Sequence, residues 1–229
     1  MTNLITCIQN ILFGLFITIL SSCATKSTYR FLAGVRAENY VENESVPIDQ
    51  ALAQTIGGTV TTVSGNPNQV TLQGAGFQIG FVEETSEAFV TSLAFFMNNY
   101  TTVSYTFDSS NFGIIKTKVA PTGSGLDATI GYNFLKGSFK IRPDLSYKIE
   151  SQSYTTTVSG SSSTTNFISN YKQSITVYGG GIAFEYAADK ENRLVLQFDY
   201  RVPSKSVPGV SSLSYTSAQL SFLFGNWLL

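Results

Sequence analysis

Hydrophobic and polar residues alternate with a period of two along several stretches of the chain. The clearest stretch is residues 139–150, where Phe139 and Ile141 fall on one face and Lys140 and Arg142 on the other. Successive side chains of a β-strand point to opposite faces of a sheet, so this period predicts strands with one apolar and one polar face. Beyond residue 26 the sequence has no helical period of useful length. The pattern therefore predicts an all-β fold.

Eight predicted strands account for the alternation. They span residues 29–40, 69–81, 87–105, 126–134, 139–150, 171–186, 193–202 and 214–224. In the second and sixth strands the alternation changes phase around Gly74 and Gly179, which predicts β-bulges. The third strand is apolar on both faces, so its facing stays open. Two shorter runs, residues 59–63 and 112–119, are loop hairpins or outer strand ends; the first is too short to span a membrane, so eight strands are preferred to ten.

The connections between these strands alternate between long and short. Long connections are expected at residues 41–68, 107–125 and 151–170, short ones at 83–86, 135–137 and 187–192, and an intermediate one at 203–212. Transmembrane β-barrels have short turns on the periplasmic side and longer loops outside. A spanning strand needs roughly 9–11 residues, which the clear strands meet or nearly meet. The layout predicts an eight-stranded antiparallel up-and-down transmembrane β-barrel over residues 23–229, with ten strands as the alternative.

The first 22 residues predict a signal peptide. Residues 5–20 form an almost unbroken apolar run, shorter than the roughly 20 residues of a spanning helix, and small residues follow it. The Leu-Ser-Ser-Cys sequence that ends at Cys23 is similar to a bacterial lipobox, whose cysteine is lipidated, whereas cleavage after Ala24 fits the ordinary small-x-small pattern. Both sites stay open. Because no Lys or Arg precedes Lys26, an uncleaved membrane anchor is the alternative.

The chain resembles the small outer-membrane β-barrel proteins of the OmpA, OmpX and opacity-protein type. The resemblance covers residues 29–229 and rests on the strand pattern and on residues 215–224, YTSAQLSFLF, which are similar to the C-terminal strand recognised by the barrel-assembly machinery. The family usually ends on an aromatic residue, whereas this chain continues to Leu229. The resemblance implies a place in the outer membrane of a Gram-negative cell. It also implies contact with outer-membrane lipids, with the assembly machinery during biogenesis, and with a host or envelope surface partner through the long loops.

A soluble barrel of the lipocalin type is the structural rival, because its strands also alternate, with the apolar face inward. Charged residues make up only 13% of the chain, against about a quarter in a typical soluble domain. Lipocalins usually carry a Gly-x-Trp motif near the first strand, and residues 31–36 read FLAGVR here. Tyr and Phe also fall near many strand ends, as in the aromatic girdles of membrane barrels. These features favour the membrane barrel. The net charge of -1 gives no sign of nucleic-acid binding.

If the apolar faces meet lipid, the polar faces fill the interior. The charged residues expected there are Arg30, Arg36, Asp127, Lys140, Arg142, Asp144, Lys148, Glu150, Arg193, Asp199 and Arg201. Buried charges destabilise a fold unless they are paired, and eight strands leave an interior just wide enough for side chains to fill. We therefore expect a closed, salt-bridged interior and a structural or surface-interaction role. Alternatives are a small gated porin for small solutes, lined by the same residues, and a lipocalin-like lipoprotein that binds an apolar ligand.

No catalytic, cofactor or metal site is predicted. Outer-membrane barrels that are enzymes use a histidine as a general base or as an essential partner, and this sequence has no histidine. The mature chain has at most one cysteine, so metal-ligand spacing is also missing. Carboxylate pairs such as Asp144 with Glu150 lie among Lys and Arg, which favours structural ion pairs over catalysis. An acidic group at Glu42, Glu44 and Asp49 is interpreted as a solvated loop. We expect a protein that is not an enzyme.

Overall fold

The computed structural model describes residues 27–43, 60–64, 69–85, 88–109, 113–134, 137–160, 167–204 and 212–228. The predicted signal peptide, both predicted cleavage sites and Cys23 lie outside these ranges. Within them, no helix has the length and apolarity to cross a membrane.

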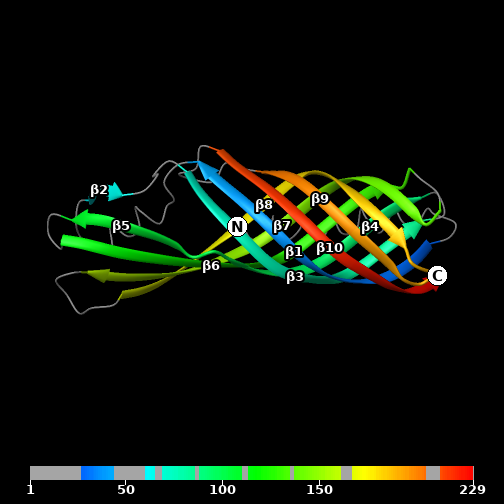
Figure 1. The fold of residues 1–229 in the computed structure, drawn as a ribbon, viewed down its shortest axis with the longest axis horizontal. Helices are drawn as coiled ribbons and strands as arrows, with labels where there is room; N and C mark the ends of the chain where they lie inside the picture. Colours follow the sequence, from blue (N-terminus) through cyan, green and yellow to red (C-terminus); the bar gives the residue numbers. More distant parts are fainter. Residues whose placement is uncertain are drawn as a thin grey trace, which may run out of the picture.

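The described residues form ten antiparallel strands (Figure 1). They are β1 (Ser27–Asn43), β2 (Val60–Ser64), β3 (Gln69–Thr85), β4 (Phe89–Tyr100), β5 (Val103–Ser109), β6 (Gly113–Tyr132), β7 (Phe139–Gly160), β8 (Phe167–Ala187), β9 (Arg193–Pro203) and β10 (Ser212–Leu228). Eight of them form a closed ring in the order β1-β3-β4-β6-β7-β8-β9-β10, which the pairing of β10 with β1 completes. The predicted eight-stranded antiparallel barrel is confirmed.

Strands β2 and β5 lie outside the ring. β5 pairs with the outer part of β6, and β2 pairs with β5. The described part of the predicted run at residues 59–63 is therefore the loop strand β2, and residues 113–119 of the run at 112–119 form the outer end of β6. The predicted strand at 87–105 is interrupted at Thr101 and Thr102, where the chain leaves the ring and continues as β5.

Two of the long connections predicted as loops consist largely of strand residues, so these predictions are wrong. Residues 113–125 belong to β6, and most of residues 151–170 belongs to β7 and β8, which pair as far as Val158 with Phe167. Figure 1 shows these strands running well past the ring. Their Thr, Val and Tyr content suits strands. They lack the apolar alternation of a membrane strand because solvent, not lipid, faces their outer side, where Thr155 and Lys172 are exposed.

The predicted β-bulges at the glycine clusters are also wrong. The pairing of β1 with β3 keeps an unbroken register across Gly74, and β7 with β8 does so across Gly179. The phase of hydrophobicity changes for another reason. On the short-turn side of Gly74 the exposed residues are apolar, such as Phe77, whereas beyond it the exposed residue is Gln73 and the buried one is Leu72. The strand leaves the apolar belt there. The same side chains still point outward and inward, but the outward ones are now polar and the inward ones apolar.

The short connections are described only in part, since residues 86–87 and 135–136 lie outside the described ranges and residues 83–85 belong to β3. Ala88 and Gly137 adopt φ values of 71° and 110°, in the left-handed region. In the β8–β9 turn the Asp189 carboxylate accepts hydrogen bonds of 2.7 Å from the backbone N–H groups of Glu191 and Asn192. These turns and the two ends of the described chain lie at one end of the barrel, which we call the short-turn end.

The wall of the barrel is apolar outside and polar inside. Side chains such as Phe95, Leu145 and Phe198 are exposed, at 42%, 68% and 44% of their surface. Their neighbours Phe96 and Ser146 on the same strands are buried. The sequence left open which face of the third predicted strand meets lipid. In β4 it is the face with Leu93, Phe95 and Met97, which point outward.

Aromatic side chains gather on the outer wall near the short-turn end. Phe89 and Tyr132 lie with ring centroids 5.1 Å apart, and Tyr132 and Phe134 lie 5.3 Å apart. Phe139 and Tyr186 are exposed on the neighbouring strands β7 and β8. This arrangement corresponds to an interfacial girdle at one edge of an apolar belt.

Candidate functional site: the charged barrel interior

The eleven charged residues expected inside the barrel lie on the inner faces of β1, β6, β7 and β9. Nine of them are buried at 5% exposure or less: Arg30, Arg36, Asp127, Arg142, Asp144, Lys148, Glu150, Asp199 and Arg201. The side chains of Lys140 and Arg193 keep 15% and 13% of their surface, because they lie at the short-turn end. The structure divides these residues between two ion-pair networks.

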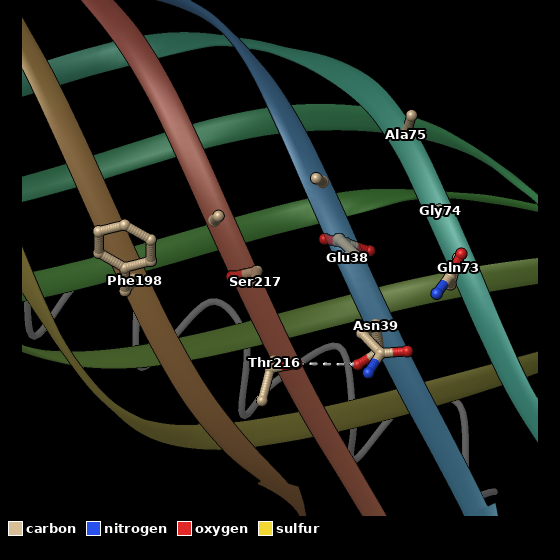
Figure 2. Close-up of a pocket in the computed structure, with 10 residues that line it drawn as sticks. Glu38, Asn39, Gln73, Gly74, Ala75, Phe198, Thr216 and Ser217 are labelled. Carbon is tan, nitrogen blue, oxygen red and sulfur yellow. Dashed lines mark hydrogen bonds between the residues drawn. The ribbon is translucent and has the colours of Figure 1, made fainter.

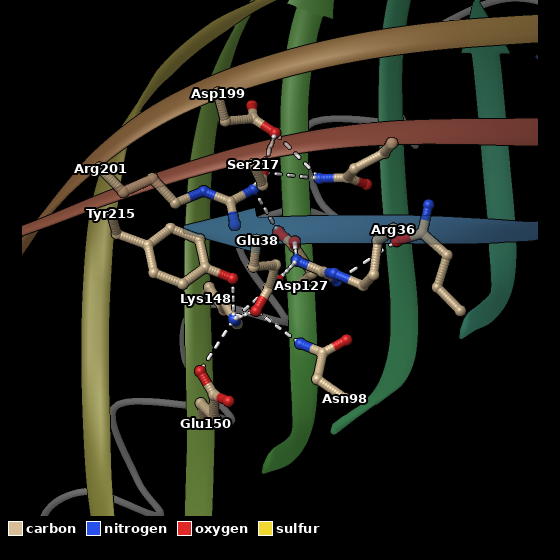
Figure 3. A network of polar contacts seen from close by, with 12 residues as sticks. Arg36, Glu38, Asn98, Asp127, Lys148, Glu150, Asp199, Arg201, Tyr215 and Ser217 are labelled. Atoms are coloured by element: carbon tan, nitrogen blue, oxygen red, sulfur yellow. Dashed lines mark hydrogen bonds and ion pairs between the residues drawn. The ribbon is translucent and has the colours of Figure 1, made fainter. Parts of the chain in front are cut away.

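The central network contains Arg36, Glu38, Asp127, Lys148, Glu150, Asp199 and Arg201 (Figure 3). Asp127 joins two cations: its Oδ2 lies 3.0 Å from Arg36 Nη2, and its Oδ1 lies 3.0 Å from Arg201 Nη2. Arg201 Nη2 is also 3.3 Å from Asp199 Oδ2. These contacts connect β1, β6 and β9 across the interior.

Lys148 holds the other half of the central network. Its Nζ lies 3.0 Å from Glu38 Oε1 and 2.8 Å from Glu150 Oε2, and it donates to the hydroxyl of Tyr215. The hydroxyl of Tyr100 lies 2.8 Å from Glu38 Oε2 and 2.5 Å from Glu150 Oε1. Charged groups removed from water need this density of partners, because each would otherwise cost several kcal/mol.

Two aromatic rings contact the cations of the central network. Phe96, fully buried, has the Arg36 guanidinium and the Lys148 ammonium each 4.3 Å from its ring centroid. Tyr215 has Lys148 Nζ at 4.1 Å and the Arg201 guanidinium at 5.7 Å. The negative ring faces attract these cations and add to the stabilisation that the carboxylates provide.

The second network, which we call the short-turn mouth, contains Arg30, Glu84, Lys140, Arg142, Glu185 and Arg193. Glu84 gathers cations from three strands: Arg30 Nη1 lies 3.2 Å and Arg193 Nη1 2.6 Å from its Oε2, and Lys140 Nζ contacts its Oε1. Glu185 is shared by Arg193, Lys140 and Arg142. Asp144 accepts a 2.7 Å hydrogen bond from Arg142 Nε.

Glu38, Glu84 and Glu185 complete these networks and were not among the predicted interior residues. Glu38 and Glu185 continue the alternation of their strands, so the polar face of the sequence carried a signal for both. The sequence pattern predicts a turn at Glu84, but β3 extends to Thr85. The sequence does not indicate that Tyr100 and Tyr215 point inward, because an aromatic residue on a strand of a membrane barrel is expected to face lipid.

Inward glycines make room for the carboxylates. A side chain at Gly131 would collide with the Asp144 carboxylate, and one at Gly181 with that of Asp199. In the Gly-Gly-Gly run at residues 179–181, Gly181 therefore makes room for Asp199, and a side chain at Gly179 would collide with the backbone of Tyr200 on β9. The strand is not broken there.

The outer wall also has a shallow hollow of about 580 Å³ (Figure 2). Its floor is a row of three alanines paired across adjacent strands, Ala75 with Ala37 and Ala37 with Ala218. Phe198 and the polar residues Asn39 and Thr216 border it. The hollow lies where the apolar belt meets the polar rim, and small side chains are sufficient to explain it.

The interior has no metal-binding character in the described part of the chain, where no group of three or more His, Cys, Asp or Glu side chains is arranged to hold an ion. The interior carboxylates are each in contact with a cation. This arrangement suits ion pairing better than proton transfer to a substrate.

An apolar, aromatic-rimmed exterior around a charged interior is the reverse of a soluble protein. It defines a transmembrane β-barrel of the outer-membrane class, set among outer-membrane lipids. The lipocalin-like alternative is wrong, because it requires the apolar faces to point inward.

Comparison with known proteins adds solved structures of similar architecture. No family model matches the chain, and no curated protein matches its sequence. The attachment invasion locus protein Ail of Yersinia pestis has 10% identity, covering 88% of this chain and 99% of Ail, with a TM-score of 0.44. Neisserial surface protein A has 12% identity over 85% of this chain and 96% of its own, with a TM-score of 0.40. The outer-membrane protease OmpT of Escherichia coli has 10% identity over 89% of this chain and 97% of its own, also with a TM-score of 0.40.

Proposed function

We propose that this protein is a closed outer-membrane barrel with a structural and surface-interaction role, without catalytic activity. The observation that carries the proposal is the linked set of buried ion pairs across the interior, in which Glu38 Oε1 contacts both Arg36 and Lys148 beside the buried ring of Phe96. An ion on its way through the barrel would have to break several of these buried contacts. Each such break leaves uncompensated charge in a low-dielectric interior.

The surface role is supported by the strands that continue outside the apolar belt. β6, β7 and β8 have 20, 22 and 21 residues, about twice the roughly 9–11 that a membrane crossing requires. Their outer parts expose Lys118, Asn170 and Lys172. A paired sheet that stands above the membrane presents a fixed surface to a host or envelope partner, whereas the closed barrel serves as its anchor.

A planar-bilayer recording tests the closed interior. The purified barrel, refolded in detergent and inserted into a bilayer, should produce no reproducible unitary current steps. Reproducible steps would contradict the proposal and favour the small gated porin. Folding is checked separately on a gel, where the unheated and heated forms of a folded membrane barrel migrate differently.

The export signal is part of the same proposal. Residues 1–22 would be removed during export through the inner membrane, and the barrel-assembly machinery would then insert residues 23–229. The intact mass of the protein purified from outer membranes tests this. A lipid-modified N-terminal Cys23, or a chain that begins after Ala24, would each fit export, whereas a mature chain that retains Met1 would indicate the uncleaved anchor.

A further inference from the structure

The short-turn mouth contains more positive than negative charge. Four cations, Arg30, Lys140, Arg142 and Arg193, surround two carboxylates, Glu84 and Glu185. Counting Asp144, which bonds to Arg142, still leaves one positive charge in excess. The central network has three cations and four carboxylates. The charges of the two networks therefore cancel over the whole described interior. The short-turn mouth by itself carries one positive charge in excess.

Several donors of these cations are also without hydrogen-bond partners. Arg30 and Arg142 are each 3% exposed, yet Arg30 Nε and Arg142 Nη1 are buried without an acceptor. Arg142 Nη1 lies 3.7 Å from Glu185 Oε2, beyond hydrogen-bonding distance. Arg193 Nε is likewise buried without an acceptor. Buried charged donors left without acceptors are costly, so this cluster has unused capacity for oxygen ligands.

Solvent reaches this cluster from one side. The side chains of Glu84, Lys140 and Arg193 keep 14%, 15% and 13% of their surface, in contrast to 0% for Arg36, Lys148 and Arg201. A solute that enters from the short-turn end meets Lys140 and Arg193 before it meets the closed central network.

We propose that the short-turn mouth is a binding site for a small oxyanion, the phosphate or carboxylate group of a solute on the short-turn side of the membrane. Lys140, Arg193 and Arg30 supply the donors. The carboxylate of Glu84 occupies part of this site in the free protein, so the ligand competes with Glu84 for the same cations. Guanidinium groups favour such ligands because their paired N–H donors match two oxygens of a carboxylate or phosphate.

Titration of the folded barrel in a non-ionic detergent with inorganic phosphate tests the site. Trp227, the single tryptophan, pairs with Tyr29 next to Arg30 and provides a fluorescence signal, and calorimetry provides a second readout. Acetate is titrated in parallel as the carboxylate probe, and sodium chloride at equal ionic strength serves as the control. We expect saturable binding of phosphate, of acetate or of both, and no comparable effect of chloride.

Variants of the cluster give opposite expected changes. Glu84→Gln removes the competing carboxylate while leaving a polar group of similar shape, so it should tighten oxyanion binding by about tenfold, and a Lys140→Ala, Arg193→Ala double variant should weaken it by about tenfold or more. Lys190→Ala is the matched control, because Lys190 is an exposed cation in the adjacent β8–β9 turn and lies outside the cluster. It should leave the affinity unchanged.

Two results would overturn the site: an unchanged affinity in Glu84→Gln, or a loss in Lys190→Ala as large as in the double variant. Heat-modifiability gels confirm that each variant is folded. If the double variant is not, the single variant Lys140→Gln replaces it, because it removes one of the cations and keeps a polar side chain. The binding test is independent of the bilayer recording, since a barrel that conducts could still bind phosphate at its mouth and a silent one could fail to.

Discussion

At the residue scale, the protein depends on charges that are inside the barrel and paired. Lys148 is the clearest case, because it is fully buried and its ammonium serves both Glu38 and Glu150. Alternation along the sequence placed Lys148 and Glu150 inside. It did not reveal that Glu38 joins them, because the contact of Glu38 on β1 with Lys148 on β7 crosses the interior and depends on how the ring closes, not on spacing within a strand.

Replacing Lys148 with methionine should destabilise the barrel by about 3–5 kcal/mol, because it leaves two buried carboxylates without their shared cation. Adding Glu38→Gln and Glu150→Gln to the same chain should recover part of this loss. Unfolding in urea, followed by the heat-modifiable gel shift, measures both effects. Lys118→Ala, which removes an exposed lysine of β6, is the control and should change little; a Lys148→Met protein as stable as the parent would mean that the network contributes no stability.

Phe96 fills the part of the interior next to Arg36 and Lys148. Truncation to alanine should destabilise the barrel by about 3–5 kcal/mol and leave a gap beside these two cations. We expect Phe96→Ala to give small current steps in a planar bilayer. Phe95→Ala, on the lipid-facing side of the same strand, should remain silent; steps in both variants, or in neither, would show that Phe96 does not close the interior.

At the element scale, the sequence predicted the membrane-spanning parts of the strands better than their outer parts. Inside the belt the apolar face marks each strand. Beyond it, residues 151–170 contain mainly Ser and Thr on both faces, so their pairing into β7 and β8 could not be distinguished from a loop. The apparent phase change at Gly74 had the same origin, since a strand that leaves lipid exchanges the polarity of its faces.

The outer hairpin of β7 and β8 should be dispensable for the barrel. Thr155 and Asn170 are directly paired, so residues 156–169 can be replaced with a two-residue Asn-Gly turn without a change of register. We expect the shortened protein to keep its heat-modifiable gel shift, because the apolar belt is intact. A matched deletion within the belt removes the two residues that flank Leu145 in β7 and the two that flank its partner Gly180 in β8. This deletion shortens the belt itself and should abolish the shift. Loss of the shift in the first variant would mean that the extension is needed for folding.

The β8–β9 turn should show a lowered pKa at Asp189. The side-chain amide of Asn192 donates to this carboxylate, as do the backbone N–H groups of Asn192 and Glu191, and these bonds hold its pKa below the usual value. A carboxyl whose folded pKa is lowered stabilises the turn at neutral pH, and that contribution is lost as the pH falls through the lowered value. NMR titration of the Asp189 side chain should show this, and Asn192→Ala should raise the pKa. An identical pKa in both proteins would exclude the Asn192 amide as the cause.

At the scale of the whole molecule, alternating connection lengths and low charge were enough to predict an eight-stranded barrel with lipid outside. The sequence could not predict that the interior charge is divided between two networks, because that division depends on the shear of the closed ring and on side chains such as Glu84 at strand ends. The inverted distribution, with apolar side chains outside and ion pairs inside, is the property on which the membrane assignment and the proposed closed barrel both depend.

Quenching of tryptophan fluorescence by brominated lipids tests this distribution most directly. In a Trp227→Phe background, Phe95→Trp and Phe96→Trp place one tryptophan on adjacent residues of β4, the first 42% exposed and the second fully buried. Tyr100→Trp, also buried on the inner face, replaces Phe96→Trp if that variant does not fold. In liposomes containing brominated acyl chains, we expect strong quenching at position 95 and little at the interior position. Equal quenching at both positions, or strong quenching only at the interior one, would contradict the barrel described here.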